Sequence, residues 1–321
     1  MHNLVSQLSV DALSASGTIG PMQSTQPTPR LAVNTSPQAE ALLQSGEITF
    51  DLLKCPAWPE TVRAALEVHA AYVHFPLRVG IGIGDAEDTE QHAPAVWKTM
   101  EALLEVTGTP WISLHLAPSL GGHLWRPEEP ETAERLAEAA LSDIESVVAR
   151  FGRERVIVEN VPESPGLAAP PAIDPQWICQ VIEAAGCGFL LDVSHARRAA
   201  RHLGMDEKDY ITKLPLAQTR EIHVTGLQRL EGRWLEATRE MYDDAYIEQH
   251  LRGRWQDHLP ITDVDWAFLD WCVEEVRAGH WGRPEIVAFE YGGVGPFFRA
   301  TTDSAVLREQ VPRLWELVHR I

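Results

Sequence analysis

The chain has 321 residues, and its hydrophobic content of 45% and charged content of 23% are ordinary for a globular protein. Its formal net charge of −19 at pH 7 gives no electrostatic attraction toward nucleic acid or an anionic membrane, so nucleic acid is an unfavourable partner. No run approaches the roughly 18 apolar residues of a membrane-spanning helix, and the N-terminus has no signal-peptide pattern, so we expect a cytoplasmic protein without a membrane partner.

The first segment of the chain differs in composition from the rest. Residues 1–29 are rich in Ser, Thr, Gln, Pro and Gly and have no lasting hydrophobic period, so we expect a flexible N-terminal tail. From residue 30 onward, short apolar runs alternate with polar breaks and amphipathic helical patterns. We therefore expect one catalytic domain over residues 30–321.

Eight short apolar runs predict strands, at residues 31–34, 48–54, 72–77, 111–116, 156–160, 188–193, 221–225 and 285–290. Helical patterns follow at 37 onward, 59–69, 95–106, 130–151, 176–185, in a pair ending at 216, and at 307–320. The alternation predicts parallel pairing, because each crossover must return across the sheet. Eight strands in about 290 residues indicate an α/β protein with a single (β/α)8 TIM barrel. An open doubly wound sheet is the alternative, although no Gly-x-Gly-x-x-Gly follows the first strand.

The sixth predicted strand ends in an acid and a histidine, Asp192 and His195. The apolar run before them fits a strand buried on both faces, which delivers its C-terminal residues to the mouth of a barrel. Asp-x-x-His there offers one carboxylate oxygen and one imidazole to a shared metal ion. For an isolated motif, a strand that simply ends in polar residues is the alternative.

The other predicted strands end in the same kinds of side chain. They are His74, His115, Glu159, His223 and Glu290, and the loop after the seventh strand adds Asp257 and His258. Imidazoles and carboxylates are the ligands of Zn, Mn and Fe. Each residue taken alone could be a buried residue with hydrogen-bond partners of its own. Their common position at one barrel mouth favours a metal site, because bound cations offset the burial and mutual repulsion of carboxylates.

This series of ligand types resembles the xylose-isomerase-like barrel superfamily, which includes endonuclease IV. The resemblance covers residues 31–321 and is closest in Val156–Asn160, Leu190–Ala196 and Ile222–Val224. A more specific resemblance runs through residues 191–195, 209–216 and 220–226. These segments are similar to a family of multinuclear non-heme iron enzymes, whose known members oxidatively modify cysteine or other side chains of ribosomally made peptides, as in methanobactin biosynthesis.

The resemblance implies a set of eight metal ligands, namely His74, His115, Glu159, Asp192, His195, His223, His258 and Glu290. It implies two or three divalent ions per chain, with Fe, Mn and Zn as the candidates. Both families usually carry Asp-x-His after the seventh strand, whereas this chain reads Gln256-Asp257-His258. The displaced carboxylate of Asp257 favours two ions over three.

Three residues are predicted to be catalytic: Glu159, Glu290 and Lys54. Lys54 ends the second predicted strand and could steady an anionic substrate, although a solvent-exposed lysine at the rim is the alternative. The same ambiguity holds for Arg78 and Arg197.

The segment 226–260 is long for a loop and contains Trp234, Tyr242, Tyr246 and Trp255. Its length and aromatic content favour a lid with a short helix at its centre, and an insertion without function is the alternative.

These features predict a metal-dependent enzyme, an oxidoreductase or an isomerase, that acts on a small molecule or a peptide. The first hypothesis is iron-dependent oxidative modification of a peptide or small thiol-containing substrate. The second is isomerisation or epimerisation of a sugar or sugar phosphate, with Glu159 and Glu290 moving the proton. An endonuclease IV-like phosphodiesterase is the weakest hypothesis because of the net charge of −19. A metal-binding protein without catalytic turnover is the non-enzymatic alternative.

Overall fold

The computed structural model of the chain describes residues 28–75, 77–80, 94–118, 129, 131–162 and 170–321. The tail predicted over residues 1–29 lies outside these ranges except for its last two residues. Within the described ranges, no helix is both long enough and apolar enough to cross a membrane.

In the described part of the chain, the main sheet contains nine strands, and all of its neighbouring strands pair in parallel. Their order is β3-β2-β1-β11-β8-β7-β6-β5-β4. They are β1 (Arg30–Asn34), β2 (Leu52–Pro56), β3 (Ala71–His74), β4 (Leu77–Arg78), β5 (Ile112–His115), β6 (Val156–Glu159), β7 (Gly188–Asp192), β8 (Thr219–Val224) and β11 (Ile286–Phe289). The predicted parallel α/β arrangement of a TIM-like fold is confirmed.

The count of nine strands differs from the predicted eight because the third predicted strand is broken into β3 and β4. These two pieces lie at opposite ends of the strand order, although they follow each other in the chain. β4 pairs with β5 through backbone hydrogen bonds. β3 reaches the same neighbourhood through side chains, since Val73 N donates to Thr109 Oγ1 (3.0 Å) and Phe75 N donates to Ser113 Oγ (3.1 Å). The order of strands therefore returns on itself, unlike that of an open doubly wound sheet.

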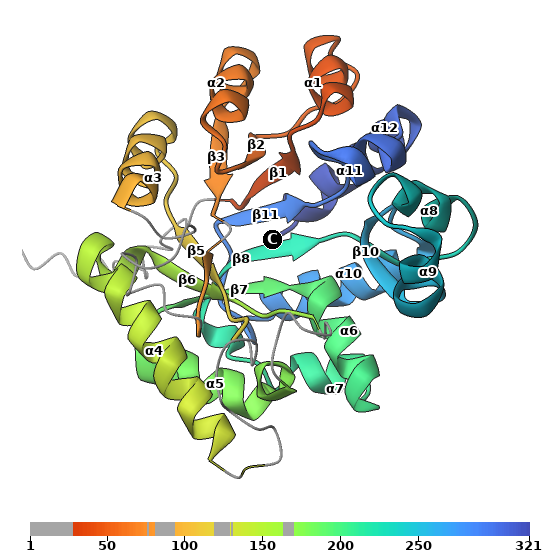
Figure 1. Cartoon of the computed structure of the whole chain (residues 1–321). Helices are drawn as coiled ribbons and strands as arrows, with labels where there is room; N and C mark the ends of the chain where they lie inside the picture. Colours follow the sequence, from red (N-terminus) through yellow and green to blue (C-terminus); the bar gives the residue numbers. More distant parts are fainter. Residues whose placement is uncertain (1–27, 76, 81–93, 119–128, 130, 163–169) are drawn as a thin grey trace, which may run out of the picture.

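Helices lie around the outside of the strands, as Figure 1 shows for α1 to α5 and α12. The bounds are α1 (Pro37–Gln44), α2 (Pro59–Val68), α3 (Pro94–Thr107), α4 (Thr132–Phe151), α5 (Pro175–Ala185), α6 (Val193–Leu203), α7 (Glu207–Ile211), α8 (Gly232–Glu236), α9 (Asp244–Tyr246), α10 (Asp263–Arg277), α11 (Pro296–Thr301) and α12 (Ser304–Val318). The sequence pattern located most of them to within a few residues, and it missed α10 and α11.

The missed helix α10 has a clear start signal. Thr262 accepts a hydrogen bond from the backbone N–H of Asp265, and the Asp265 carboxylate accepts one from the backbone N–H of Thr262. This reciprocal capping box satisfies two donors that a helix N-terminus leaves open. Ser36 caps α1 in a similar way, by accepting from Ala39 N at 3.1 Å.

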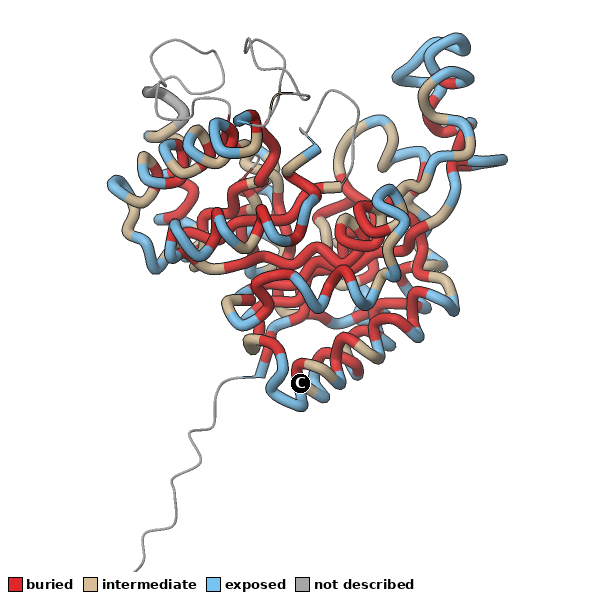
Figure 2. Tube along the Cα trace, turned by 90° about the horizontal axis from the view of Figure 1, so that it is seen from below, coloured by how far each residue is buried: buried red, intermediate tan, exposed pale blue. Residues whose placement is uncertain are grey.

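Side chains alternate along the strands between two environments. On β8, Ile222 and Val224 point into the large core between strands and helices. Glu221 and His223 occupy the opposite face, and the Glu221 carboxylate accepts a hydrogen bond from the Tyr72 hydroxyl at 2.8 Å, although Tyr72 lies on the non-neighbouring strand β3. This second face is therefore the interior of the barrel. Figure 2 shows the buried strands in red between helices whose outer faces are exposed.

The segment between β8 and α10 forms a small subassembly of its own. Its ends pair as an antiparallel ribbon of β9 (Gly226–Arg229) and β10 (Trp255–Leu259). Short helical turns between them surround a separate apolar cluster that contains Trp234 and Ile247. Trp234 is thus buried, and of the four aromatic residues only Tyr242 and Tyr246 are strongly exposed. The interpretation of this segment as a lid stays a prediction.

Candidate metal centre

Strand alternation places the predicted metal ligands of the barrel strands, and the predicted catalytic residue Lys54, on one face. The residues are Lys54 on β2, His74 on β3, His115 on β5, Glu159 on β6, Asp192 on β7 and His223 on β8, with Glu290 directly after β11. Each lies near the C-terminal end of its strand. For Lys54, His74 and Glu290, the residue two positions earlier in the chain belongs to the cluster inside the barrel. Because side chains with a period of two share a face, these residues meet at one mouth of the barrel.

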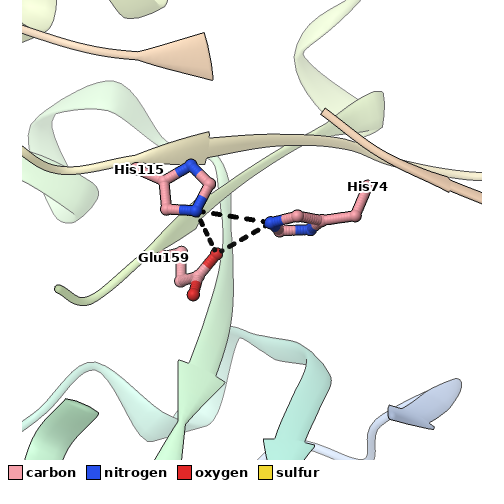
Figure 3. A group of neighbouring side chains, drawn as sticks. All are labelled: His74, His115 and Glu159. Carbon is pink, nitrogen blue, oxygen red and sulfur yellow. Dashed lines mark hydrogen bonds and ion pairs between the residues drawn. The ribbon is translucent and has the colours of Figure 1, made fainter. Parts of the chain in front are cut away.

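The first group of converging side chains is His74, His115 and Glu159, drawn in Figure 3. The Nε2 atoms of the two histidines are 3.3 Å apart, and they lie 3.5 Å and 3.3 Å from Glu159 Oε2. The opposite ring nitrogens are engaged elsewhere, His74 Nδ1 with Ser113 Oγ (3.0 Å) and His115 Nδ1 with Leu77 O (3.2 Å). These contacts leave both Nε2 atoms directed at the carboxylate.

The second group is Glu159, Asp192 and His223. His223 Nδ1 lies 3.8 Å from Glu159 Oε1, 4.0 Å from Asp192 Oδ2 and 3.2 Å from Glu290 Oε1. On the other side of the ring, His223 Nε2 hydrogen-bonds with Glu221 Oε1 at 2.8 Å. Glu159 belongs to both groups, so its carboxylate lies between two sets of ligand atoms.

Three buried polar atoms of these groups have no hydrogen-bond partner among the residues that the structure describes: Glu159 Oε2, Asp192 Oδ2 and His223 Nδ1. Burying a polar atom without a partner costs about 1–3 kcal/mol, and more when the group is charged. A divalent cation among the three atoms would satisfy all of them, and carboxylate and imidazole are suitable donors for Zn, Mn or Fe. The residues therefore fit the metal ions that the sequence predicts.

The pKa values of the buried groups at the site are displaced strongly by their surroundings. Burial lowers the pKa of His223, but the carboxylate of Glu290 and the contacts with Glu159 and Glu221 raise it to about 10 overall. Burial raises the pKa of Asp192 to about 6, although the nearby His195 opposes this shift. Such displaced pKa values are typical of functional sites.

His195 lies beside the two groups rather than at their centre. Its Nδ1 is 3.3 Å from Glu159 Oε1 and 3.0 Å from the Asn160 carbonyl oxygen. Its Nε2 faces the Asp257 carboxylate at 3.3 Å. Burial lowers the pKa of His195, but Asp192, Asp257 and Glu159 together raise it well above its usual value.

The residues of the long insertion reach the site differently. His258 lies on strand β10 of the antiparallel ribbon and not at the end of a barrel strand. Its φ of 58° is in the left-handed region. Its Nδ1 lies 2.9 Å from the Glu290 carbonyl oxygen, and its Nε2 is 4.0 Å from Asp257 Oδ1. Among the residues that the structure describes, His195, Asp257 and His258 do not converge as closely as the two groups above.

The basic residues of the mouth have different environments from those expected for a rim. Lys54 is 6% exposed and forms an ion pair with Glu290, so the interpretation as a solvent-exposed lysine is wrong. Arg197 is 2% exposed and pairs with Glu207 and Asp265, which makes it a structural residue of the helical layer. Arg78 is half-buried and donates to the Ala117 carbonyl oxygen at 3.1 Å.

Several residues near the site were missed in the sequence. Glu221 precedes His223 by two positions, so its place on the same face could have been found from parity alone. Tyr72 shares parity with His74 and is 3% exposed. Arg198, which donates to Asp257 Oδ2 at 3.0 Å, gives no sequence signal, because its partner is 59 residues away.

A cavity of about 370 Å3 is lined by all three residues of the first group, whereas Glu159 alone represents the second group in the lining. Its polar lining includes Asn34 and Lys54, in addition to the histidines and carboxylates. Its apolar lining includes Trp58, which is 51% exposed, together with Val294 and Phe298. The cavity volume is in the range typical of small-molecule sites, ~300–1,000 Å3.

Comparison with known sequences identifies a matching family. The model of the RiPP precursor modification enzyme family MbnB/TglH/ChrH matches residues 56–261. A UPF0276 protein of Anaeromyxobacter sp. strain Fw109-5 is 28% identical over 199 residues, which are 57% of this chain and 68% of that protein. A UPF0276 protein of Bordetella pertussis is 30% identical over 107 residues, 33% of this chain and 37% of that protein. The match thus spans well under half of the Bordetella relative.

Solved structures share the fold over almost the whole chain. A xylose isomerase domain containing protein from Salmonella typhimurium LT2 has a TM-score of 0.51 at 19% identity, covering 90% of this chain and 97% of that one. The IolI protein, solved with a bound zinc atom, has a TM-score of 0.54 at 10% identity, with 90% and 98% covered. An L-ribulose 3-epimerase has a TM-score of 0.52 at 14% identity, with 91% and 94% covered. The expected xylose-isomerase-like fold is confirmed.

Proposed function

Because the chain belongs to the RiPP precursor modification enzyme family MbnB/TglH/ChrH, we propose that it is a metal-dependent enzyme that oxidatively modifies a ribosomally made peptide. The family and the fold support a metal-dependent TIM-barrel enzyme. The observation that carries the proposal is the position of Glu159, whose buried carboxylate is shared by two converging groups of ligand atoms. A shared carboxylate is suited to hold two ions close together, as multinuclear chemistry requires.

The ligands of the proposed centre fall into two positions. His74, His115 and Glu159 would hold one ion, and Glu159, Asp192 and His223 would hold the other, with Glu290 adjacent to His223. When bound, divalent ions would supply Lewis acidity, and iron would add redox chemistry with O2. His195 and His258 complete the proposed ligand set at its edge.

The residues around the ions have roles that their contacts support. Lys54 and Glu290 form an ion pair, and both line the cavity. Burial raises the pKa of Glu290, but His223 and Lys54 hold it well below its usual value, so this carboxylate is ionised. Glu290 can therefore accept a proton or ligate an ion, and Lys54 can neutralise an anionic substrate group. We accordingly propose Lys54, Glu159 and Glu290 as the catalytic residues.

The cavity suggests how a substrate side chain would bind. Trp58, Val294 and Phe298 form an apolar part of the lining, and Asn34 supplies an amide. An apolar lining with a few convergent polar groups can orient one side chain of a peptide while the rest of the peptide stays outside. Trp58 lines the cavity and is also exposed to solvent, which supports a role for its ring in contacting the peptide.

The experiment that tests this proposal begins with protein purified and loaded with Fe(II) without air. We expect about two iron ions per chain and O2 consumption when a cysteine-containing peptide is added. E159Q is the matched control, because it keeps the shape of the bridging residue and removes its charge. Protein that carries only Zn or Mn and consumes no O2 after loading with iron would contradict the oxidative proposal.

Sugar isomerisation or epimerisation is the second candidate, and one observation favours it. Glu159 and Glu290, on different strands, both line the cavity and could exchange a proton with a bound sugar. Interconversion of hexoses under nitrogen would select this activity, because it needs no oxidant. Cleavage of DNA is disfavoured by the net charge of −19, and failure to nick a duplex with an abasic site would exclude it.

A further inference from the structure

The Asp257 carboxylate differs from the other buried carboxylates at the mouth because protein donors engage both of its oxygens. Oδ2 accepts a hydrogen bond from Arg198 Nη1 at 3.0 Å and lies 3.3 Å from His195 Nε2. Oδ1 accepts one from Gln256 Nε2 at 2.8 Å. Asp257 is 3% exposed, so these partners replace water almost completely. Glu159 Oε2, in contrast, has no hydrogen-bond partner within the ranges that the structure describes.

The helix α6 brings Arg198 to this position. Asp192 accepts a hydrogen bond from His195 N at 2.7 Å and thereby caps the helix, which fixes its first turn to the end of strand β7. Arg198 follows His195 by three residues, so the two side chains lie on one face of the helix. The guanidinium of Arg198 and the imidazole of His195 therefore approach the same carboxylate together.

The neighbouring His258 is the residue that would share a third ion with Asp257. Adjacent residues of an extended strand point to opposite faces, and the φ of 58° at His258 turns its side chain toward Glu290. Its Nε2 remains 4.0 Å from Asp257 Oδ1. The same 4.0 Å separates His223 Nδ1 from Asp192 Oδ2 in the second group, so the protein donors at Asp257, and not its distance from His258, distinguish this place from the two groups.

We propose that the Arg198 guanidinium supplies the positive charge at Asp257 that a third divalent ion would otherwise bring, so that the centre holds two ions. This inference rests on the proposed function, since it concerns the number of ions in that centre. Arginine stays protonated in proteins, and its planar donors match a carboxylate. An ion at this place would meet a fixed positive charge and would have to compete for an oxygen that is already bonded.

The test measures the number of ions directly. The full-length protein and its variants are brought to equilibrium with excess Mn2+ under argon, and bound manganese per chain is determined by elemental analysis. We expect two ions in the wild type and three in Arg198→Ala, which opens the Asp257 carboxylate. Arg201→Ala is the matched control, because Arg201 lies on the same helix and pairs with Glu207 instead of Asp257, so two ions are expected there.

Two further variants separate charge from folding. Arg198→Lys keeps the positive charge and is expected to bind two ions. Arg198→Gln removes the charge but keeps much of the side chain, so it replaces the alanine variant if that variant does not give a native circular dichroism spectrum. Three ions in the wild type, or two in a folded Arg198→Ala or Arg198→Gln, would overturn the role of Arg198. No bound ion in the wild type would instead contradict the proposed function, so the two failures are distinguishable.

Discussion

The ligands on the barrel strands and those on the insertion reach one mouth by different routes. Glu159, Asp192 and His223 stand on neighbouring parallel strands, and one ligand atom of each lacks a hydrogen-bond partner in the described part of the chain. Asp257 comes from an antiparallel ribbon outside the barrel, and its carboxylate is fully engaged by protein donors. A carboxylate close to the other ligands is therefore not necessarily a metal ligand itself. Atoms kept without a protein partner are the ones poised for an ion.

The largest effect is expected at the residue that both strand-borne groups share. Glu159→Gln removes the charge from both ion positions, so we expect bound Mn2+ to fall from two ions per chain to none that survives dialysis. Elemental analysis of the dialysed protein checks this expectation. Retention of one ion would mean that one group binds without Glu159, and the bridging role would then be wrong.

A smaller effect on metal binding is expected from Glu221, which contacts the ligand His223. Glu221 holds His223 Nε2 at 2.8 Å and thereby directs His223 Nδ1 toward Glu159 and Asp192. Loss of such a supporting carboxylate typically costs ~10–100-fold in metal affinity, and we expect a loss of that size in Glu221→Gln. Titration with Mn2+ measures it, with Glu285→Gln as the control because Glu285 is exposed. Equal affinities of both variants would contradict the orienting role.

The pH dependence of the stability of the metal-free protein tests the protonation of His223. The pKa of His223 is raised from 6.5 to about 10, so its contribution to stability is complete below pH 6.5 and is lost as the pH rises through about 10. We expect the Tm of the metal-free protein to fall over this window. Ion binding needs a neutral imidazole, so the Tm increase caused by Mn2+ should grow as the pH rises. A Tm of the metal-free protein that stays flat across this window would show that His223 titrates near its ordinary value.

The smallest effect on ion content is expected on the insertion. Asp257→Asn should leave two Mn2+ ions per chain, because Asp257 belongs to neither converging group. The substitution removes the charge that faces Arg198 and His195, so we expect the free energy of unfolding to fall by about 3 kcal/mol. Chemical denaturation of the metal-free variant measures this loss. A loss of one ion instead would place Asp257 among the ligands.

The two routes also explain what the sequence could predict. The strand-borne residues follow from a period of two and from the position of each strand end, so His74, His115, Glu159, Asp192 and His223 could be located from the sequence alone. Glu221 lies two positions before His223 on β8, so its place on the same face could also be predicted from the sequence. By contrast, the ion pair of Lys54 with Glu290 joins residues 236 positions apart, and no local pattern indicates such a contact.

The insertion was beyond sequence reasoning for a physical reason. Its ribbon has an irregular register between Gln256 and Leu259, and His258 adopts a left-handed backbone conformation that is uncommon outside glycine. A bulge of this kind redirects side chains without leaving a mark in the hydrophobic pattern. The break between β3 and β4 was hidden for a similar reason, because the apolar run continues across it.

At the break between β3 and β4, side-chain hydroxyl groups form the contact that closes the barrel, and we call this contact the hydroxyl joint. The amides of Val73 and Phe75 are held by Thr109 and Ser113 side chains instead of a backbone ladder. Ser113 Oγ also contacts His74 Nδ1 at 3.0 Å, so one hydroxyl closes the barrel and orients a ligand. If Ser113 moved away from Phe75, it would also lose its contact with the His74 imidazole. We therefore expect bound ions to slow the exchange of these two amide hydrogens with solvent deuterium, which makes the joint a reporter of metal occupancy.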